Sequence, residues 1–223
     1  MFLMDASASV VRYMAQPHRL EFLMPGAGRQ SIYFPDFEAR VPLWFASEML
    51  KGEPFAKIAM RMPPQRVLNE QLVTLVLEIK TSKDRRVSDP KYLNKLRLAK
   101  AIYSRLGYYF FVINDDQDIK CLDLRHMQSM AMDGRAKVSA ETCFAAWSIL
   151  EGSRGGTSYR AMVEALGGGP LAREATNCLH MQGLIWIDLM RAPHDLTRVA
   201  MPPLLGRNLD YLLNAYSAYK KAA

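Results

Sequence analysis

The segment 72–114 constrains the fold more than any other part of the chain. It begins with the aliphatic run LVTLVLEI (72–79) and ends with the aromatic run YYFFVIN (108–114), both typical of buried strands. Between them, DPKYLNKLRLAKAIYSRLG (89–107) starts with Asp and Pro, ends with Gly and has apolar residues at helical spacing. A strand, a helix and a strand at these lengths predict a βαβ unit with parallel neighbouring strands.

Upstream, three short runs rich in β-branched and aromatic residues predict strands: VVRY (10–13), HRLEFL (18–23) and SIYFPDF (31–37). The last two flank the turn PGAGRQ (25–30), so 18–37 is predicted to be a hairpin that ends at Asp36. PLWFASEMLKG (42–52), which begins with Pro and ends with Gly, predicts a short helix. Residues 53–70 are expected to be irregular.

The pattern changes after residue 132. DGRAKVSA (133–140) is read as a linker, followed by three predicted helices and two predicted strands: 141–151, 157–166, 170–182, 184–190 and 196–201. Three short helices and a hairpin are the plan of a winged helix-turn-helix, and a last helix is expected over 207–221. The predicted organisation is an α/β domain over 1–132, with a mixed central sheet flanked by helices, and a winged-helix domain over 141–223.

Composition narrows the class of partner. The 223-residue chain has a net charge of +7, and nine basic against two acidic side chains fall within 80–105. A local basic excess favours a polyanion such as double-stranded DNA. Three dispersed cysteines, without a CxxC pair, argue against a zinc site or disulfide framework and suit a reducing cytoplasm. No apolar run approaches the length of about 20 residues that spans a membrane, and no signal peptide is recognised, so a cytoplasmic location is expected.

The strand 72–79 ends in a pair of opposite charges. Glu78 and Lys80 are two residues apart and therefore point to the same face of a strand. Asp36 would join them if its strand pairs in the same sheet. Two close carboxylates repel each other unless a divalent cation lies between them, and oxygen ligands suit Mg²⁺ or Mn²⁺. Lys80 would then orient or deprotonate a water for attack on phosphorus. Ile79 is expected to face the other side and pack under the helix 89–107.

PDF (35–37) followed by EIK (78–80) resembles the motif of the PD-(D/E)XK nuclease superfamily, whose fold is restriction-endonuclease-like. The alternative for Glu78 and Lys80 is an ordinary ion pair on the surface of an edge strand. In the nuclease interpretation, Asp36, Glu78 and Lys80 are catalytic. The same interpretation implies that Asp36, Glu78 and the backbone carbonyl of Ile79 bind the metal.

A more specific resemblance covers most of residues 2–115. SVVRYMAQPHRLEF (9–22), YFPDF (33–37), LVLEIK (75–80) and KLRLAKAIYSRLGYYFFVIND (95–115) are similar to the N-terminal domain of TnsA-like endonucleases of Tn7-type transposases. That family also continues into a winged helix. The resemblance implies DNA cleavage at transposon ends alongside a DDE transposase subunit and a AAA+ regulator.

The sequence departs from this family in two places. The resemblance implies a further acidic metal ligand in a helix upstream of VVRY, at a position that falls before Met1. Asp36 and Glu78 are also 42 positions apart (78 − 36), so residues 38–70 are expected to contain an insertion. Gln16 either lines the active site or closes the turn before Pro17.

Basic and polar side chains near the predicted site and in the winged helix are candidate DNA contacts: Lys83, Arg85, Arg86, Lys95, Arg173 and Asn177. On the predicted recognition helix 170–182, Arg173, Thr176, Asn177 and His180 are expected to face outward. That domain could equally pack on a protein. Two further functions stay open beside the transposition nuclease: a stand-alone phage or defence nuclease, and a catalytically inactive DNA-binding or assembly subunit.

Overall fold

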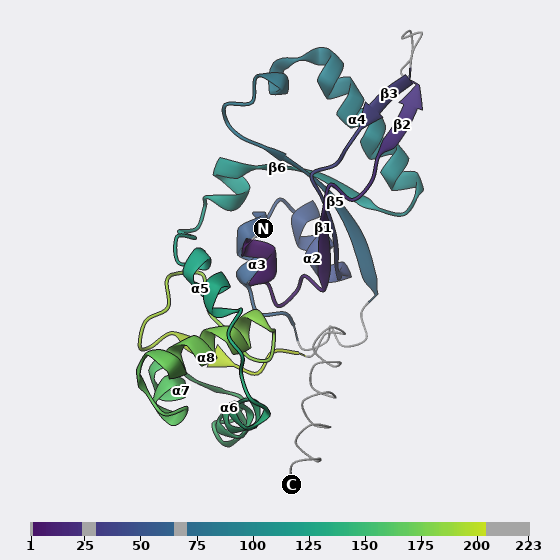
Figure 1. The fold of residues 1–223 in the computed structure, drawn as a ribbon. Coiled ribbons are helices and arrows are strands. Elements are labelled where there is room, and N and C mark those ends of the chain that lie inside the picture. Colours follow the sequence, from purple (N-terminus) through teal and green to yellow (C-terminus); the bar gives the residue numbers. More distant parts are fainter. Residues whose placement is uncertain (1, 24–29, 65–70, 204–223) are drawn as a thin grey trace. The chain divides into compact units, whose positions relative to one another are not determined.

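The computed structural model describes residues 2–23, 30–64 and 71–203 (Figure 1). Contacts divide the chain into two compact units, and each unit combines segments that are distant in the sequence. One unit comprises 12–55 and 71–121, and the other comprises 1–11, 56–70 and 122–223. This grouping differs from the predicted boundaries around 133–140, which stay a prediction. The predicted helix 207–221 and most of the predicted turn 25–30 lie outside the described residues.

The chain is a mixed α/β protein whose central sheet has the strand order β1–β4–β5–β6. The β1–β4 and β4–β5 pairs are antiparallel and the β5–β6 pair is parallel. A separate hairpin, β2–β3, belongs to the same unit. The strands and helices of this unit are β1 (Arg12–Ala15), β2 (Leu20–Leu23), β3 (Gln30–Tyr33), β4 (Phe37–Pro42), α2 (Leu43–Leu50), β5 (Leu72–Lys80), the 3₁₀ turn η2 (Arg85–Ser88), α4 (Pro90–Arg105), β6 (Tyr109–Asn114) and the π-helical turn η3 (Asp115–Ile119). The predicted βαβ unit is confirmed.

Helix α4 begins and ends where its sequence indicates. The Asp89 carboxylate accepts a hydrogen bond from the Lys91 N–H, and Pro90 occupies the first turn, where its missing N–H leaves no donor unpaired. Gly107, just past the helix, has φ +76°, a backbone conformation that favours glycine. The helix is therefore fixed at both ends by local signals, before any packing is considered.

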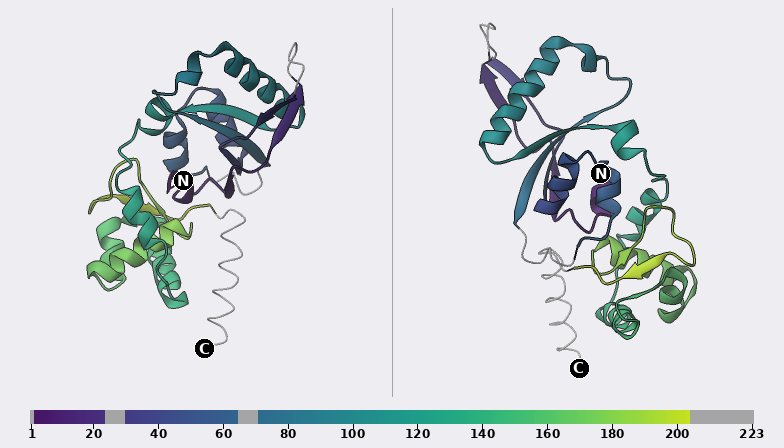
Figure 2. Two further views of the ribbon diagram at one scale, coloured as in Figure 1. Left: turned by 45° about the horizontal axis from the view of Figure 1, so that its top comes forward. Right: turned by 180° about the vertical axis from the view of Figure 1, so that it is seen from behind.

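Helix α4 packs on the sheet face that carries Val76. Its buried residues Leu96, Ala99 and Tyr103 form one hydrophobic cluster with Val76 and Phe110 of the sheet. Phe22 and Tyr33 of the β2–β3 hairpin complete this cluster, and Figures 1 and 2 show the hairpin lying alongside α4. Positions 76, 78 and 80 share one face of β5. Glu78 and Lys80 therefore lie on the α4 side of the sheet, and the expectation that Ile79 packs under α4 is wrong.

The segment around Asp36 also differs from prediction. The hairpin ends at Tyr33, and a new strand, β4, begins at Phe37, so Asp36 precedes a strand instead of ending one. Pro35 cannot donate to a ladder, which separates the two strands. The segment 38–70 was expected to be an insertion that contains a helix. The helix is confirmed as α2, whereas the first residues of the segment pair with β5 as part of the central sheet. A further helix, α3 (Phe55–Met60), falls where irregular structure was expected.

The three helices predicted after residue 140 are confirmed. Ser139 and Ser158 cap α6 and α7 by accepting hydrogen bonds from backbone N–H groups. The turn before α8 has three successive glycines at positive φ, 105°, 71° and 73°, which residues with a Cβ would adopt only under strain. The elements of this unit are α1 (Phe2–Asp5), most of α3, α5 (Met127–Asp133), α6 (Ala140–Gly152), β7 (Gly156–Ser158), α7 (Tyr159–Ala165), α8 (Gly169–Met181), β8 (Trp186–Ile187) and β9 (Arg198–Ala200), with the three strands paired in the order β7–β9–β8.

A helix that the sequence did not reveal, α5, packs against α8. Asn177 on α8 donates to Asp133 at the end of α5 over 2.7 Å, and Gly134 lies so close to α8 that a Cβ there would be 2.8 Å from the Met181 Cβ. Thr176, Asn177 and His180 are buried, so the expectation that they face outward is wrong. Of the four residues expected to be outward, Arg173 is exposed. The segment 133–136 thus packs on α8. No described helix is both long enough and apolar enough to cross a bilayer.

Candidate active site

Asp36 is attached to the end of β5 by two hydrogen bonds. Its backbone N–H donates to the Leu77 carbonyl over 3.1 Å, and its Oδ2 accepts from the Ile79 N–H over 2.6 Å. The side chain of Asp36 thereby takes a ladder donor of β5 at the point where Pro35 turns the chain away. Asp36 is thus held at the backbone between Glu78 and Lys80, as the sequence predicted.

Glu78 is a buried carboxylate, 5% exposed, that accepts three hydrogen bonds from side chains. Its Oε1 accepts from Lys80 Nζ over 2.6 Å and from the Tyr92 hydroxyl over 2.5 Å. Its Oε2 accepts from the Tyr33 hydroxyl over 2.6 Å. These donors come from β5, α4 and β3. Three different elements therefore fix the orientation of this carboxylate.

Lys80 is 4% exposed and lies between two carboxylates. Besides Glu78, its ammonium approaches Asp84 Oδ2 at 3.3 Å and lies 4.5 Å from the centroid of the Tyr92 ring. Burial alone would lower the pKa of Lys80, but the hydrogen bonds to Glu78 and Tyr92 outweigh it and the net pKa is raised. Lys80 is therefore an ammonium at neutral pH in this arrangement.

The electrostatics of the cluster favour a cation. The pKa of Asp36 is raised, because burial and the negative charge of Glu78 outweigh the hydrogen bond from the Ile79 N–H. Hydrogen bonds from Arg86 hold the pKa of Asp84 well below its usual range. The two cations of the cluster, Lys80 and Arg86, offset only part of the charge of the three carboxylates, which leaves a formal excess of one negative charge (three minus two).

Asp36 and Glu78 are the residues here that could hold a metal ion. No described residue donates a hydrogen bond to Asp36 Oδ1, and Glu78 uses three of the roughly four acceptor positions of a carboxylate. Two carboxylates completed by water suit Mg²⁺, which usually keeps several waters. Over the described ranges, no group of three or more His, Cys, Asp or Glu side chains is arranged to hold a metal. The carboxylate oxygens of Asp36 and Glu78 fit Mg²⁺ chemically, but these two residues form a small set of ligands.

The other predicted residues near the site are placed as follows. Gln16 has φ +46°, its backbone N–H donates to the Asp36 carbonyl over 2.9 Å, and its side chain is exposed. Arg86 is bound to Asp84, whereas Lys83 and Arg85 are exposed. Lys95 on α4 lies 5.9 Å from the centroid of the Tyr33 ring. Among these side chains, Arg86 contacts the cluster through Asp84. The contacts of the basic residues with DNA stay predictions, as does the Ile79 carbonyl as a ligand.

The two predicted contacts on α8 differ from each other. Arg173 is exposed and lines a cavity of about 310 Å³ together with His126 and His194. Asn177 is 6% exposed and joins Tyr159, whose hydroxyl donates to it over 2.8 Å, to Asp133. Both polar atoms of its amide thus have a partner within the protein. Asn177 also lines this cavity, but its burial and these two partners make a contact with DNA unfavourable.

Three residues of the cluster escaped the sequence analysis: Tyr33, Tyr92 and Asp84. Tyr92 carried a readable signal, because positions 92, 96, 99 and 103 form one stripe of α4 and the last three are buried on the sheet. Tyr92 lies one turn before Leu96, which places it beside the end of β5, where Glu78 and Lys80 lie. Tyr33 and Asp84 carried no comparable signal, since their roles depend on how the hairpin and the loop after β5 fold back.

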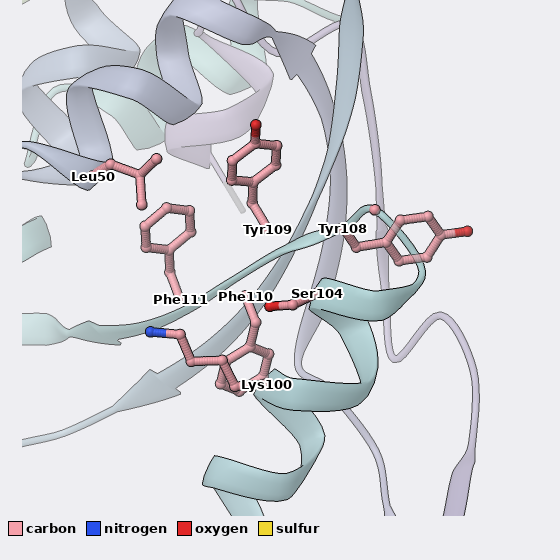
Figure 3. A pocket seen from close by; sticks show the side chains of 8 residues that line it. Leu50, Lys100, Ser104, Tyr108, Tyr109, Phe110 and Phe111 are labelled. Carbon is pink, nitrogen blue, oxygen red and sulfur yellow. The ribbon is translucent and has the colours of Figure 1, made fainter.

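A cavity of about 390 Å³ is lined by none of these residues. It follows β6, with Leu50 of α2 on one side and Lys100 and Ser104 of α4 on the other. Figure 3 shows Tyr109 and Phe111 pointing toward Leu50, and Phe110 pointing toward Lys100. Half of its lining residues are aromatic, and none is a carboxylate. It does not contribute to the carboxylate cluster.

Comparisons with known proteins leave the family open. No protein-family model matches this sequence, and no curated protein matches it at a significant level. The resemblance to TnsA-like endonucleases therefore stays a hypothesis that depends on the motifs quoted above. What can be argued about function depends on the geometry of the described residues.

Proposed function

We propose that the protein is a divalent-metal-dependent DNA endonuclease whose active site contains Asp36, Glu78 and Lys80. The observation that carries the proposal is the hydrogen bond from the Ile79 N–H to Asp36, which joins the PDF and EIK segments at one point. A buried Lys80–Glu78 pair beside it argues against a solvent-exposed ion pair on an edge strand. The strand order β1–β4–β5–β6, with α4 between parallel strands, supports the restriction-endonuclease-like class.

Each residue has a separate role in phosphodiester hydrolysis. A bound Mg²⁺ or Mn²⁺ would polarise the phosphate and lower the pKa of a bound water. Asp36 and Glu78 would hold the ion, and the exposed Lys83 and Arg85 would contact backbone phosphates. Lys80, as an ammonium, would orient the water and offset negative charge on the phosphate in the transition state. Its raised pKa favours this donor role over that of a general base.

We further propose that the nuclease acts as a TnsA-like subunit, with a DDE transposase and a AAA+ regulator as partners at transposon ends. This part depends on the resemblance. The helix and strand order α6, β7, α7, α8, β8, β9 supports a winged-helix domain. The buried side of α8 makes DNA reading through Asn177 unfavourable, which leaves the exposed Leu171 and Arg173 for contact with a partner.

One observation favours a second candidate function, an inactive DNA-binding or assembly subunit. Both oxygens of Glu78 are already hydrogen-bonded to protein donors, and only two carboxylates serve as metal ligands in the cluster. A site satisfied in this way is stable without an ion. The basic residues around it would still hold DNA by their charge.

Nicking of supercoiled plasmid by the purified full-length protein separates the candidates. With Mg²⁺ or Mn²⁺, we expect cutting that EDTA abolishes and that Asp36→Asn, Glu78→Gln and Lys80→Ala each reduce at least about 100-fold. Lys51→Ala is the matched control, because Lys51 forms an exposed pair with Glu48 in the same unit. Its cutting rate should equal that of the unmodified protein.

The outcomes assign the function. Equal absence of cutting in the unmodified protein and the variants, with DNA binding retained, contradicts the nuclease and supports the inactive subunit. Cutting that needs no partner protein supports a stand-alone nuclease over the transposition subunit. Cutting that appears only when transposase and AAA+ subunits from the same locus are added supports the TnsA-like role.

A further inference from the structure

The acceptor positions of Glu78 are unequally available. Oε2 is directed at Tyr33, which is 3% exposed and belongs to the hydrophobic cluster with Tyr103 and Phe110. The Oε2 side therefore has no room for a hydrated ion. Oε1 is directed toward Lys80, the residue whose charge also acts on Asp36. A cation shared by Asp36 and Glu78 must therefore approach Oε1.

Oε1 already accepts two hydrogen bonds, from Lys80 and Tyr92. A carboxylate oxygen offers about two acceptor positions, so Oε1 has none left. A cation can bind there only if one donor leaves. The structure thus contains a competition between a protein hydrogen bond and the ion that the proposed function requires.

Burial decides which donor gives way. Lys80 is 4% exposed and is also held by Asp84 at 3.3 Å. Its ammonium would therefore lose the hydrogen bond to Glu78 without gaining one to solvent, which is unfavourable. Tyr92 is half-buried near the start of α4, so it is the donor that lies closer to solvent. The Tyr92 hydroxyl, which donates to Oε1, is therefore the donor that gives way.

We propose that Tyr92 is a positioning residue that occupies the metal-binding position of Glu78 in the metal-free protein and leaves it when the ion binds. Tyr33 has the opposite role, because its buried hydroxyl holds Oε2 and thereby keeps Oε1 directed toward Lys80, whose charge also acts on Asp36. This inference depends on the proposed function, since it concerns the same metal site. It explains how a buried, charged site stays satisfied before metal and DNA arrive.

The two tyrosines should therefore change metal affinity in opposite directions. Removing one hydrogen bond to a charged group changes affinity by about ten- to a hundredfold. We expect Tyr92→Phe to lower the Kd for Mn²⁺ by that factor and Tyr33→Phe to raise it. Phe at 92 keeps the ring that lies beside Lys80 and Arg86. A merely structural role would weaken binding in both variants.

Electron paramagnetic resonance titration of Mn²⁺ into the full-length protein measures this without any cleavage. Tyr108→Phe is the matched control, because Tyr108 stacks on Tyr103 and makes no contact with Glu78 among the described residues. Its Kd should stay within about twofold of the unmodified protein. Circular dichroism of each variant checks folding. A tyrosine absorbance change on adding Mg²⁺, present in the unmodified protein and lost in Tyr92→Phe, follows the displacement directly.

The inference and the proposed function fail in different ways. Binding that Glu78→Gln abolishes but Tyr92→Phe leaves unchanged or weakens overturns the role of Tyr92 and keeps the metal site. Absence of any Glu78-dependent binding, in the unmodified protein and in Tyr92→Phe alike, overturns the metal site and the inference together. Binding that appears only in Tyr92→Phe supports the inference in its strongest form.

Discussion

Two buried polar clusters in this protein use their side chains differently. At the end of β5, Glu78 and Lys80 are charged, almost fully buried and paired, and Asp36 beside them keeps one carboxylate oxygen that no described residue donates to. Under α5, Asn177 is a neutral amide whose oxygen and nitrogen are both taken, by Tyr159 and Asp133. The first cluster leaves an acceptor atom without a donor in the described ranges, whereas both polar atoms of Asn177 join α8 to α5 and α7. A polar residue therefore indicates function only when its partners are known.

The comparison predicts that the largest loss of unfolding free energy follows replacement of Lys80. Lys80→Met would leave the Glu78 charge buried without its counter-ion, and breaking such a pair costs about 3 to 5 kcal/mol of unfolding free energy. Urea denaturation of the folded variant measures this loss. Replacing both residues, Glu78→Leu with Lys80→Met, should restore most of the stability, because no buried charge remains. A double variant as unstable as the single one contradicts the pairing.

Replacing Asn177 tests the second cluster, because the change should lower stability and leave DNA binding unchanged. Asn177→Ala removes the partner of the Tyr159 hydroxyl and of Asp133, which should cost about 2 kcal/mol of unfolding free energy. The exposed Arg173→Ala should change stability by less than about 0.5 kcal/mol. DNA affinity, measured by fluorescence anisotropy where both variants are folded, should be unchanged for Asn177→Ala. A specific loss of affinity would restore Asn177 as a DNA contact.

Gly134 tests how closely α8 and the end of α5 are packed. A Cβ at Gly134 would lie 2.8 Å from the Met181 Cβ, so Gly134→Ala should cost about 1 to 2 kcal/mol of unfolding free energy. At Gly152, which ends α6, an added Cβ meets no atom within 4 Å. Gly152→Ala should leave stability unchanged or slightly raised. Thermal denaturation of the pair measures the difference, and equal melting temperatures would show that α5 and α8 are not closely packed.

The smallest predicted effect on stability is at Cys178, the neighbour of Asn177 on α8, whose thiol donates to the Ala136 carbonyl. Burial raises the pKa of the Cys178 thiol to about 11, above its value in an unfolded chain. The protonated thiol is thus favoured by folding, so its contribution to stability is complete below about pH 8.5 and is lost as pH rises toward 11. The difference in unfolding free energy between the unmodified protein and Cys178→Ala should shrink by about 1 kcal/mol between pH 7 and pH 10.5. A difference that stays constant between pH 7 and pH 10.5 would contradict a raised pKa of this thiol.

Local signals predicted much of this fold. The Asp-Pro start and Gly end of α4, the serine caps of α6 and α7 and the aliphatic run of β5 each depend on neighbours in the sequence, and all were found. The elements that escaped prediction are short: β4, α3, α5 and β7 have three to seven residues each. Such segments are stabilised by what packs on them and carry little periodicity of their own.

The sequence by itself determined that Glu78 and Lys80 share a face, because strand geometry has a period of two, and it marked Asp36 as their partner through the PDF and EIK motifs. Only the tertiary structure decided which face that is, which tyrosines hold Glu78, and that α5 covers Asn177. The physical reason is the sequence separation over which each interaction acts. Caps and periodicity act within a few residues, whereas the donors of Glu78 come from positions 33, 80 and 92, and which of them reaches it is settled only when β3, β5 and α4 pack together.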